Sequence, residues 1–161
     1  MKIENIIRKV LREQEEEKLL KIPGLKFFND DWNILQKFLE SQGNPRYSIG
    51  GDLNLRGSDI KSLGNLVRVE GTLNLNNCGN LQSLGKLEYV GDALDLRNTK
   101  IETLGNLNYV DFDLYLDAEY IKTLDSLGNL EYVGGDLYWE GCDYNIDEIE
   151  EVVWVEGQLY L

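Results

Sequence analysis

The stretch Leu127–Trp139, LGNLEYVGGDLYW, contains a unit that recurs along most of this chain. Its core is the triplet Leu137-Tyr138-Trp139, in which two large apolar residues flank one intervening residue. Aligning the chain on such triplets gives six registers, separated by 20, 21, 20, 23 and 22 residues. The first residues of the triplets are Leu53, Leu73, Leu94, Leu114, Leu137 and Leu159. A β-branched residue lies four positions before each triplet: Ile49, Val69, Val90, Val110, Val133 and Val155.

These repeats predict a mainly β solenoid over residues 47–161. A coil of about 21 residues is too small to bury its own apolar residues, so successive coils must stack and align them in continuous rows. The alternation within each triplet predicts a short strand with both apolar residues pointing inward. Strands of the same direction in successive coils then form a parallel sheet, with a second short strand near each upstream β-branched residue. We expect about five such coils.

The spacing of one coil resembles a known repeat family. Leu94-x-Leu96-x-x-Thr99-x-Ile101 has the pattern L-x-L-x-x-N/C-x-L and is similar to the core of leucine-rich repeats. The unit at Leu127–Trp139 is similar to the receptor L-domain branch of these solenoids. The resemblance implies a right-handed solenoid with short coils and little helix, and a binding surface rather than one particular activity. A short acidic chain with a helical cap also looks like small solenoid proteins encoded by tailed phages.

Residues 1–46 lack the repeat and predict a helical N-terminal cap. Apolar residues recur at helical spacing in a first helix that Pro23-Gly24 would end, and Asn29-Asp30-Asp31 supplies caps for a second. Capping a solenoid is the usual role of atypical terminal segments. A partner-binding element, a membrane-surface element and a semi-independent arm are alternatives for the first helix. The first apolar stripe is Ile3, Ile6, Ile7, Val10 and Leu11, and the second is Trp32, Leu35, Phe38 and Leu39.

Composition excludes several classes of function. The 161 residues carry a net charge of -13, which argues against direct binding to nucleic-acid phosphates or to an anionic membrane surface. Because the chain has no His, a Ser-His-Asp triad, a Cys-His dyad and a His-ligated metal are all impossible. No apolar run reaches the 18 or so residues that span a bilayer. No secretory signal precedes the repeats, so we expect a cytoplasmic protein, in the host cytoplasm if it is viral.

The two cysteines have a structural interpretation. Cys78 and Cys142 occupy the coil position of Ser58 and Thr99, which in leucine-rich repeats is a small inward site that bonds neighbouring loop backbone. Three coils separate them by roughly 14 Å at the usual strand spacing, whereas a disulfide needs Cα atoms within about 7 Å. We therefore expect two free thiols.

No residue pattern indicates chemistry. Acidic residues cluster in the later coils, but they match no calcium-binding loop and form no distinct pair of carboxylates for glycoside hydrolysis. We expect no enzyme activity, no catalytic residue, no metal site and no cofactor.

The outward positions of the triplets carry the functional hypothesis. Along the coils the middle position changes from Asn54, Asn74 and Asp95 to Tyr115, Tyr138 and Tyr160. Residues 101–161 hold 15 acidic residues, only one basic residue, Lys122, and seven of the nine tyrosines. Tyrosine gives a large contact area at small entropic cost, although a column of tyrosines also stabilises neighbouring strands by stacking. The expected partner-binding residues are Asp113, Tyr115, Asp117, Asp136, Tyr138, Glu140 and Tyr160.

We therefore expect a non-enzymatic protein-binding module that engages a basic protein surface, with a phage protein acting on a host factor as one version. Two alternatives stay open. One is a structural or virion-assembly protein. Since the last triplet ends at Leu161 without a polar cap, such a protein would form a homo-oligomer through its C-terminal edge strand, unless a partner or the segment 146–153 covers it. The other is a carbohydrate-binding module that stacks sugars on Tyr115, Tyr138 and Tyr160.

Overall fold

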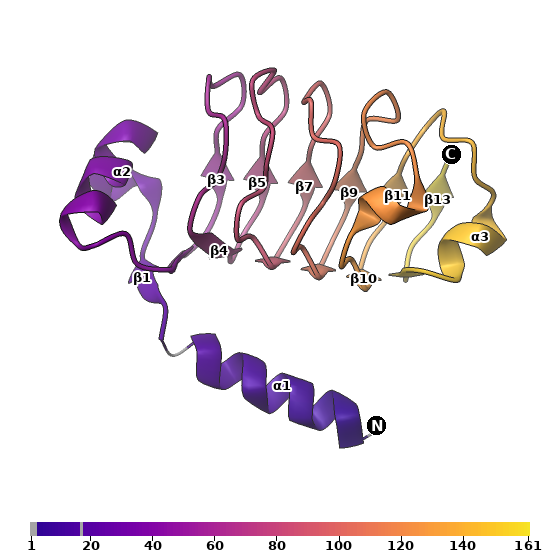
Figure 1. Cartoon of the computed structure of the whole chain (residues 1–161), viewed down its shortest axis with the longest axis horizontal. Helices are drawn as coiled ribbons and strands as arrows, with labels where there is room; N and C mark the ends of the chain where they lie inside the picture. Colours follow the sequence, from indigo (N-terminus) through magenta and orange to yellow (C-terminus); the bar gives the residue numbers. More distant parts are fainter. Residues whose placement is uncertain (1–2, 17) are drawn as a thin grey trace.

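A computed structural model describes residues 3–16 and 18–161. In this structure the first two residues of each predicted triplet form a short strand, and the six strands make up one of two parallel sheets. The six strands pair in register, Leu to Leu, in the order β13-β11-β9-β7-β5-β3. We call this sheet the triplet sheet (Figure 1). Its strands are β3 (Leu53–Asn54), β5 (Leu73–Asn74), β7 (Leu94–Asp95), β9 (Leu114–Tyr115), β11 (Leu137–Tyr138) and β13 (Leu159–Tyr160).

The predicted second strand of each coil is also present. It contains the upstream β-branched residue, and these strands form a seven-stranded parallel sheet in the order β1-β2-β4-β6-β8-β10-β12. We call it the valine sheet. Its strands are β1 (Leu20–Ile22), β2 (Tyr47–Ile49), β4 (Leu66–Val69), β6 (Tyr89–Val90), β8 (Tyr109–Val110), β10 (Tyr132–Val133) and β12 (Trp154–Val155). The mainly β, parallel solenoid fold with short coils is thereby confirmed.

The core consists of rows of identical or similar residues, one from each coil. The leading leucines from Leu53 to Leu137 are completely buried, as are the valines from Val69 to Val133. In the fifth triplet Trp139 replaces leucine, and its buried Nε1 donates a hydrogen bond to the Ile121 carbonyl oxygen at 2.9 Å. The row therefore accepts a larger side chain because the indole N–H has a partner inside the core.

The inward small residues satisfy backbone carbonyls, as the resemblance implied. The buried Cys78 thiol donates to the Leu55 carbonyl oxygen of the preceding coil at 3.0 Å, and Thr99 Oγ1 donates to the Leu96 carbonyl oxygen at 2.7 Å. Cys78 and Cys142 are both free thiols, which confirms that no disulfide joins them. Cys142 is only partly buried and lies 3.7 Å from the Tyr144 carbonyl oxygen.

The second predicted helix is present, and its cap is the one expected. Helix α2 (Trp32–Ser41) begins after Asp31, whose carboxylate accepts hydrogen bonds from the backbone N–H groups of Asn33 and Ile34. Its residues Leu35 and Leu39 are buried. The short 3-10 helix η1 (Leu25–Phe28) packs against α2, and Phe28 and Phe38 approach to 5.3 Å between ring centroids.

The prediction of one helix up to Pro23 is wrong. Helix α1 (Ile3–Glu16) ends earlier, and β1 follows it, pairing in parallel with β2 from Leu20↔Tyr47 to Ile22↔Ile49. The valine sheet thus extends one strand before the first repeat. The α1 stripe from Ile3 to Leu11 is 45–73% exposed, and α1 projects away from the solenoid in Figure 1. In the part of the chain that is described, cover for the first coil comes from β1, η1 and α2.

The 23-residue step from Leu114 to Leu137 contains an additional short helix. Its extra residues form the 3-10 helix η2 (Leu124–Leu127), where Leu127 is buried and the Thr123 hydroxyl accepts a hydrogen bond from the Ser126 N–H. The last coil contains the short helix α3 (Ile146–Glu150), which anchors the coil through buried Ile149. Among the described residues, no helix has both the length and the apolar character needed to cross a membrane.

Close approach of neighbouring coils generates a stability prediction. A Cβ atom at Gly91 would lie 2.3 Å from the Glu70 carbonyl oxygen, whereas one at Gly79 would meet no atom within 4 Å. We expect Gly91→Ala to lower the free energy of unfolding by about 2 kcal/mol or more, because two backbones must separate. The matched Gly79→Ala should change it by less than about 1 kcal/mol. Urea unfolding followed by circular dichroism measures both, and equal effects would contradict the coil contact.

Candidate binding face

The expected partner-binding residues lie on or beside the last three strands of the triplet sheet. Tyr115, Tyr138 and Tyr160 occupy paired positions in β9, β11 and β13. Asp113 and Asp136 directly precede the triplets of β9 and β11, while Asp117 and Glu140 directly follow them. The structure therefore brings all seven residues onto one outward surface, which we call the acidic face.

The three tyrosines form a continuous stack. The rings of Tyr115 and Tyr138 are 4.5 Å apart between centroids with planes 8° apart, and those of Tyr138 and Tyr160 are 4.5 Å apart with planes 3° apart. On the other side of Tyr115, the guanidinium carbon of Arg97 lies 4.6 Å from the ring centroid. Both ring faces of Tyr115 and of Tyr138 are thus covered, and these rings present their edges and hydroxyls to solvent.

The aspartates beside the tyrosines join neighbouring coils. Asp113 accepts a hydrogen bond from the Asp136 N–H at Oδ1, at 2.8 Å, and one from the Tyr115 hydroxyl at Oδ2, at 3.2 Å. Asp136 repeats this arrangement with the Gln158 N–H at 2.8 Å and the Tyr138 hydroxyl at 3.3 Å. Each carboxylate therefore stabilises the solenoid while contributing negative charge to the acidic face.

Asp117 and Glu140 differ in their roles, although they occupy equivalent coil positions. The Asp117 carboxylate accepts hydrogen bonds from the backbone N–H groups of Asn98, at 3.1 Å, and Glu119, at 3.0 Å. Glu140 is exposed and makes no hydrogen bond or ion pair with any described residue. Among the carboxylates of these seven residues, Glu140 is therefore the one through which binding would break no hydrogen bond or ion pair with a described residue.

The hydroxyls of Tyr115 and Tyr138 have a pKa above the ordinary tyrosine value. Burial against the neighbouring rings and the hydrogen bond to Asp136 raise the pKa of Tyr138 to about 12. Burial and the charge of Asp113 also raise the pKa of Tyr115. Tyr115 and Tyr138 therefore present neutral hydroxyls among carboxylates at physiological pH.

A second aromatic column lies on the valine sheet and also connects coils. The guanidinium carbon of Arg68 lies 3.5 Å from the Tyr89 ring centroid, and Tyr109 and Tyr132 approach to 6.2 Å between centroids. The Tyr89 hydroxyl donates to Asp111 of the next coil, and the Tyr109 hydroxyl donates to Glu131 Oε2 at 2.8 Å. These contacts give the second column a structural role, because they join each coil to the next.

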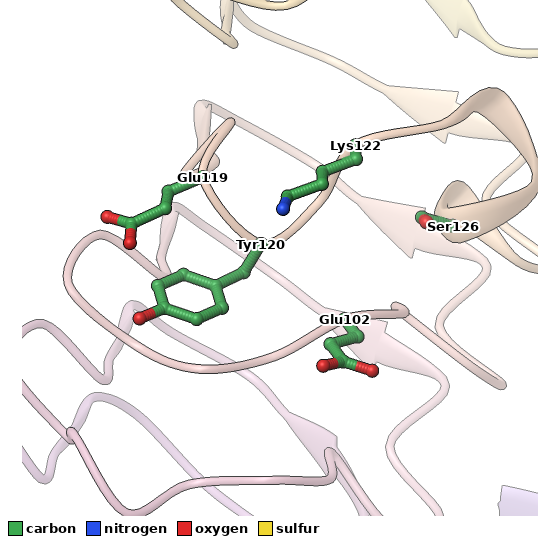
Figure 2. A pocket seen from close by; sticks show the side chains of 5 residues that line it. All are labelled: Glu102, Glu119, Tyr120, Lys122 and Ser126. Atoms are coloured by element: carbon green, nitrogen blue, oxygen red, sulfur yellow. The ribbon is translucent and has the colours of Figure 1, made fainter.

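A separate hollow of about 370 Å³ opens among the loops of the third and fourth coils. It is lined by Glu102, Glu119, Tyr120, Lys122 and Ser126 (Figure 2). The carboxylates of Glu102 and Glu119 lie well apart on its rim in Figure 2 and do not form a close acid/base pair. Residue spacing does not predict this hollow, although Glu102 and Lys122 follow the equivalent residues Ile101 and Ile121.

Comparison with known proteins adds no assignment. Searches against protein-family models, curated proteins and solved structures each found no match. Within residues 3–16 and 18–161, no three or more His, Cys, Asp or Glu residues gather in a geometry that could hold a metal ion.

The double role of the aspartates yields a stability prediction. Asp113→Ala removes the acceptors of the Asp136 N–H and the Tyr115 hydroxyl, so the free energy of unfolding should fall by about 1–3 kcal/mol. Glu140→Ala removes the same charge at an exposed site and should change it by no more than about 0.5 kcal/mol. Chemical denaturation of the two variants at neutral pH provides the measurement. Equal losses would show that charge, and not the coil-to-coil hydrogen bonds, determines the effect.

The tyrosine pKa values predict a loss of stability at alkaline pH. Tyr47, Tyr89 and Tyr138 each have a pKa of about 12 in the folded chain, compared with about 10 in the unfolded chain. Folding therefore favours the neutral phenols, and their contribution is complete below about pH 10 and declines between about pH 10 and 12. Tyrosinate absorbance should titrate at higher pH in the folded chain than in urea, and identical titrations would contradict the stacked, hydrogen-bonded arrangement.

Proposed function

We propose that this chain is a non-enzymatic protein-binding module of the leucine-rich-repeat type that uses the acidic face to engage a protein with a basic surface. The observation that carries the proposal is the concentration of 15 acidic residues against one basic residue in residues 101–161, together with seven of the nine tyrosines. Charge of one sign accelerates association with an oppositely charged partner and makes the association sensitive to salt.

The geometry of the tyrosines supports edge-on contact with a protein. Stacked rings with covered faces are rigid, so little side-chain entropy is lost when a partner binds their edges. Sugar stacking needs an open ring face, which Tyr115 and Tyr138 do not provide because each ring is covered on both sides, so a carbohydrate site on this column would be limited to Tyr160. The same proposal includes a cytoplasmic location. In one version of it, the chain is a phage protein that occupies a basic surface of a host factor.

Two charge-reversal variants test the proposal. Glu140→Lys combined with Asp143→Lys changes two exposed carboxylates that follow β11, and Glu40→Lys combined with Asp59→Lys makes the same change of net charge far from the acidic face. We expect the native partner to be captured from lysate of the source organism by the wild-type chain and by the second variant, but not by the first. Quantitative mass spectrometry identifies and measures the retained proteins.

The captured partner is then purified and its affinity measured across a series of salt concentrations. Binding to the acidic face should weaken steeply as salt rises, because the charges on both surfaces become screened. Binding that ignores salt, or that falls equally in both variants, would overturn the proposal.

Self-association is a second candidate function, because β12 and β13 are the outermost strands of their sheets and Trp154 on β12 is 68% exposed. A structural or virion-assembly protein would pair through these edge strands. Size-exclusion chromatography with light scattering decides between the candidates, since a monomer at high protein concentration argues against assembly.

A further inference from the structure

The outward column that follows each triplet changes sign along the solenoid. Its residues are Arg56, Asn76, Arg97, Asp117 and Glu140, so its first half is basic and amide-rich whereas its second half belongs to the acidic face. Around the first half the triplet sheet carries a hollow of about 420 Å³. The hollow is lined by Arg56, Asn74, Asn76, Asp95, Arg97 and Asn98.

The one carboxylate of this hollow is already fully engaged. Asp95 accepts hydrogen bonds from Arg97 Nε, at 3.0 Å, and Arg97 Nη2, at 2.6 Å, and Asn76 Nδ2 lies 3.3–3.4 Å from both oxygens. Burial opposes ionisation, but the bonds from Arg97 prevail and lower the pKa of Asp95. Asp95 therefore stays ionised and leaves little acceptor capacity for a ligand.

Hydrogen-bond donors in the hollow are in excess. The Arg56 guanidinium makes no hydrogen bond or ion pair with any residue that the structure describes. Asn74 uses Oδ1 to accept the Asn76 N–H, at 3.1 Å, so its amide N–H₂ group stays available. Arg97 uses only Nε and Nη2 of a guanidinium that carries five N–H donors. The free groups thus match an acceptor-rich ligand.

One of the two guanidinium groups of the hollow, that of Arg97, is also preorganised. Arg97 is held from one side by Asp95 and from another by the Tyr115 ring, at 4.6 Å from the centroid. Arg56 and Arg97 extend from strands two coils apart, about 10 Å at the usual strand spacing, with Asn76 between them. Two guanidinium groups and one engaged carboxylate give the hollow a net charge of about +1 beside a strongly acidic face.

We propose that this hollow is a binding site for an oxyanion, a carboxylate or a phosphoryl group, held by Arg56, Arg97 and Asn74. Guanidinium groups bind the oxygens of both anions through paired, charge-assisted hydrogen bonds. The site lies outside the acidic face, so it does not depend on the proposed function.

The test is a titration of the isotopically labelled full chain with inorganic phosphate and, separately, with succinate, at constant ionic strength. Saturable shifts in the nuclear magnetic resonance signals of the Arg97 side-chain N–H and the Asn74 amide group are expected with at least one of the two. Shifts with phosphate alone assign a phosphoryl group, shifts with succinate alone assign a carboxylate, and shifts with both support a general oxyanion site.

A pair of variants controls for nonspecific charge. Arg56→Gln should weaken binding of the effective anion about tenfold, the usual effect of losing one charge-assisted contact. Lys61→Gln removes the same charge from an exposed residue outside the hollow and should leave the affinity unchanged. The proposal is overturned by an absence of saturable shifts with both anions, or by equal weakening in the two variants.

Discussion

Parallel pairing of each coil with the next is the interaction on which the whole structure depends. No coil has enough apolar residues to form a core alone, so the rows of leucine and valine exist only because backbone hydrogen bonds hold successive coils in register. In-register pairing also places equivalent outward side chains next to one another, close to the strand spacing of about 4.8 Å. The stacked tyrosines, at 4.5 Å, show this spacing directly.

The same pairing creates a difficulty for charged residues, because equal charges in adjacent coils repel. The acidic face resolves it through hydrogen bonds. Asp113 and Asp136 each spread their charge over an N–H of the next coil and a tyrosine hydroxyl of their own coil. A surface can therefore be strongly acidic and still stabilise its scaffold. The residues that hold the coils together are distinct from Glu140, whose carboxylate makes no hydrogen bond or ion pair with a described residue.

The repeat could be predicted from the sequence because its signal is repeated six times, so the triplet strands and the valine strands follow from spacing alone. The inward position of Cys78 is what the resemblance to leucine-rich repeats implied. Strand β1 could not, since Leu20-Lys21-Ile22 is too short to show a period of its own and follows a charged, helix-favouring run. This segment forms a strand because it pairs with Tyr47–Ile49, which lies far along the chain. Similarly, the α1 periodicity predicts an apolar stripe but not what covers it.

For the face, the sequence predicts which residues share a column but not how their side chains point. That the tyrosine rings lie face to face, that each aspartate uses both oxygens, and that Arg97 turns toward both Asp95 and Tyr115 are results of side-chain conformation. The polar hollow beside them was missed because its members come from three coils and from different columns. Its excess of donors depends on which side-chain N–H groups the bonds to Asp95 and Asn74 leave available, and residue spacing does not specify this.

Because contacts run mainly between adjacent coils, the solenoid resists a stretching force in a particular way. Tension applied at the C-terminal end would load only the hydrogen bonds between the last two coils, and would remove coils one after another instead of unfolding the chain at once. Each released coil of about 21 residues would lengthen the chain by roughly 65 Å. A solenoid built this way would open stepwise under load, and its helix-covered N-terminal coils would be the last to open.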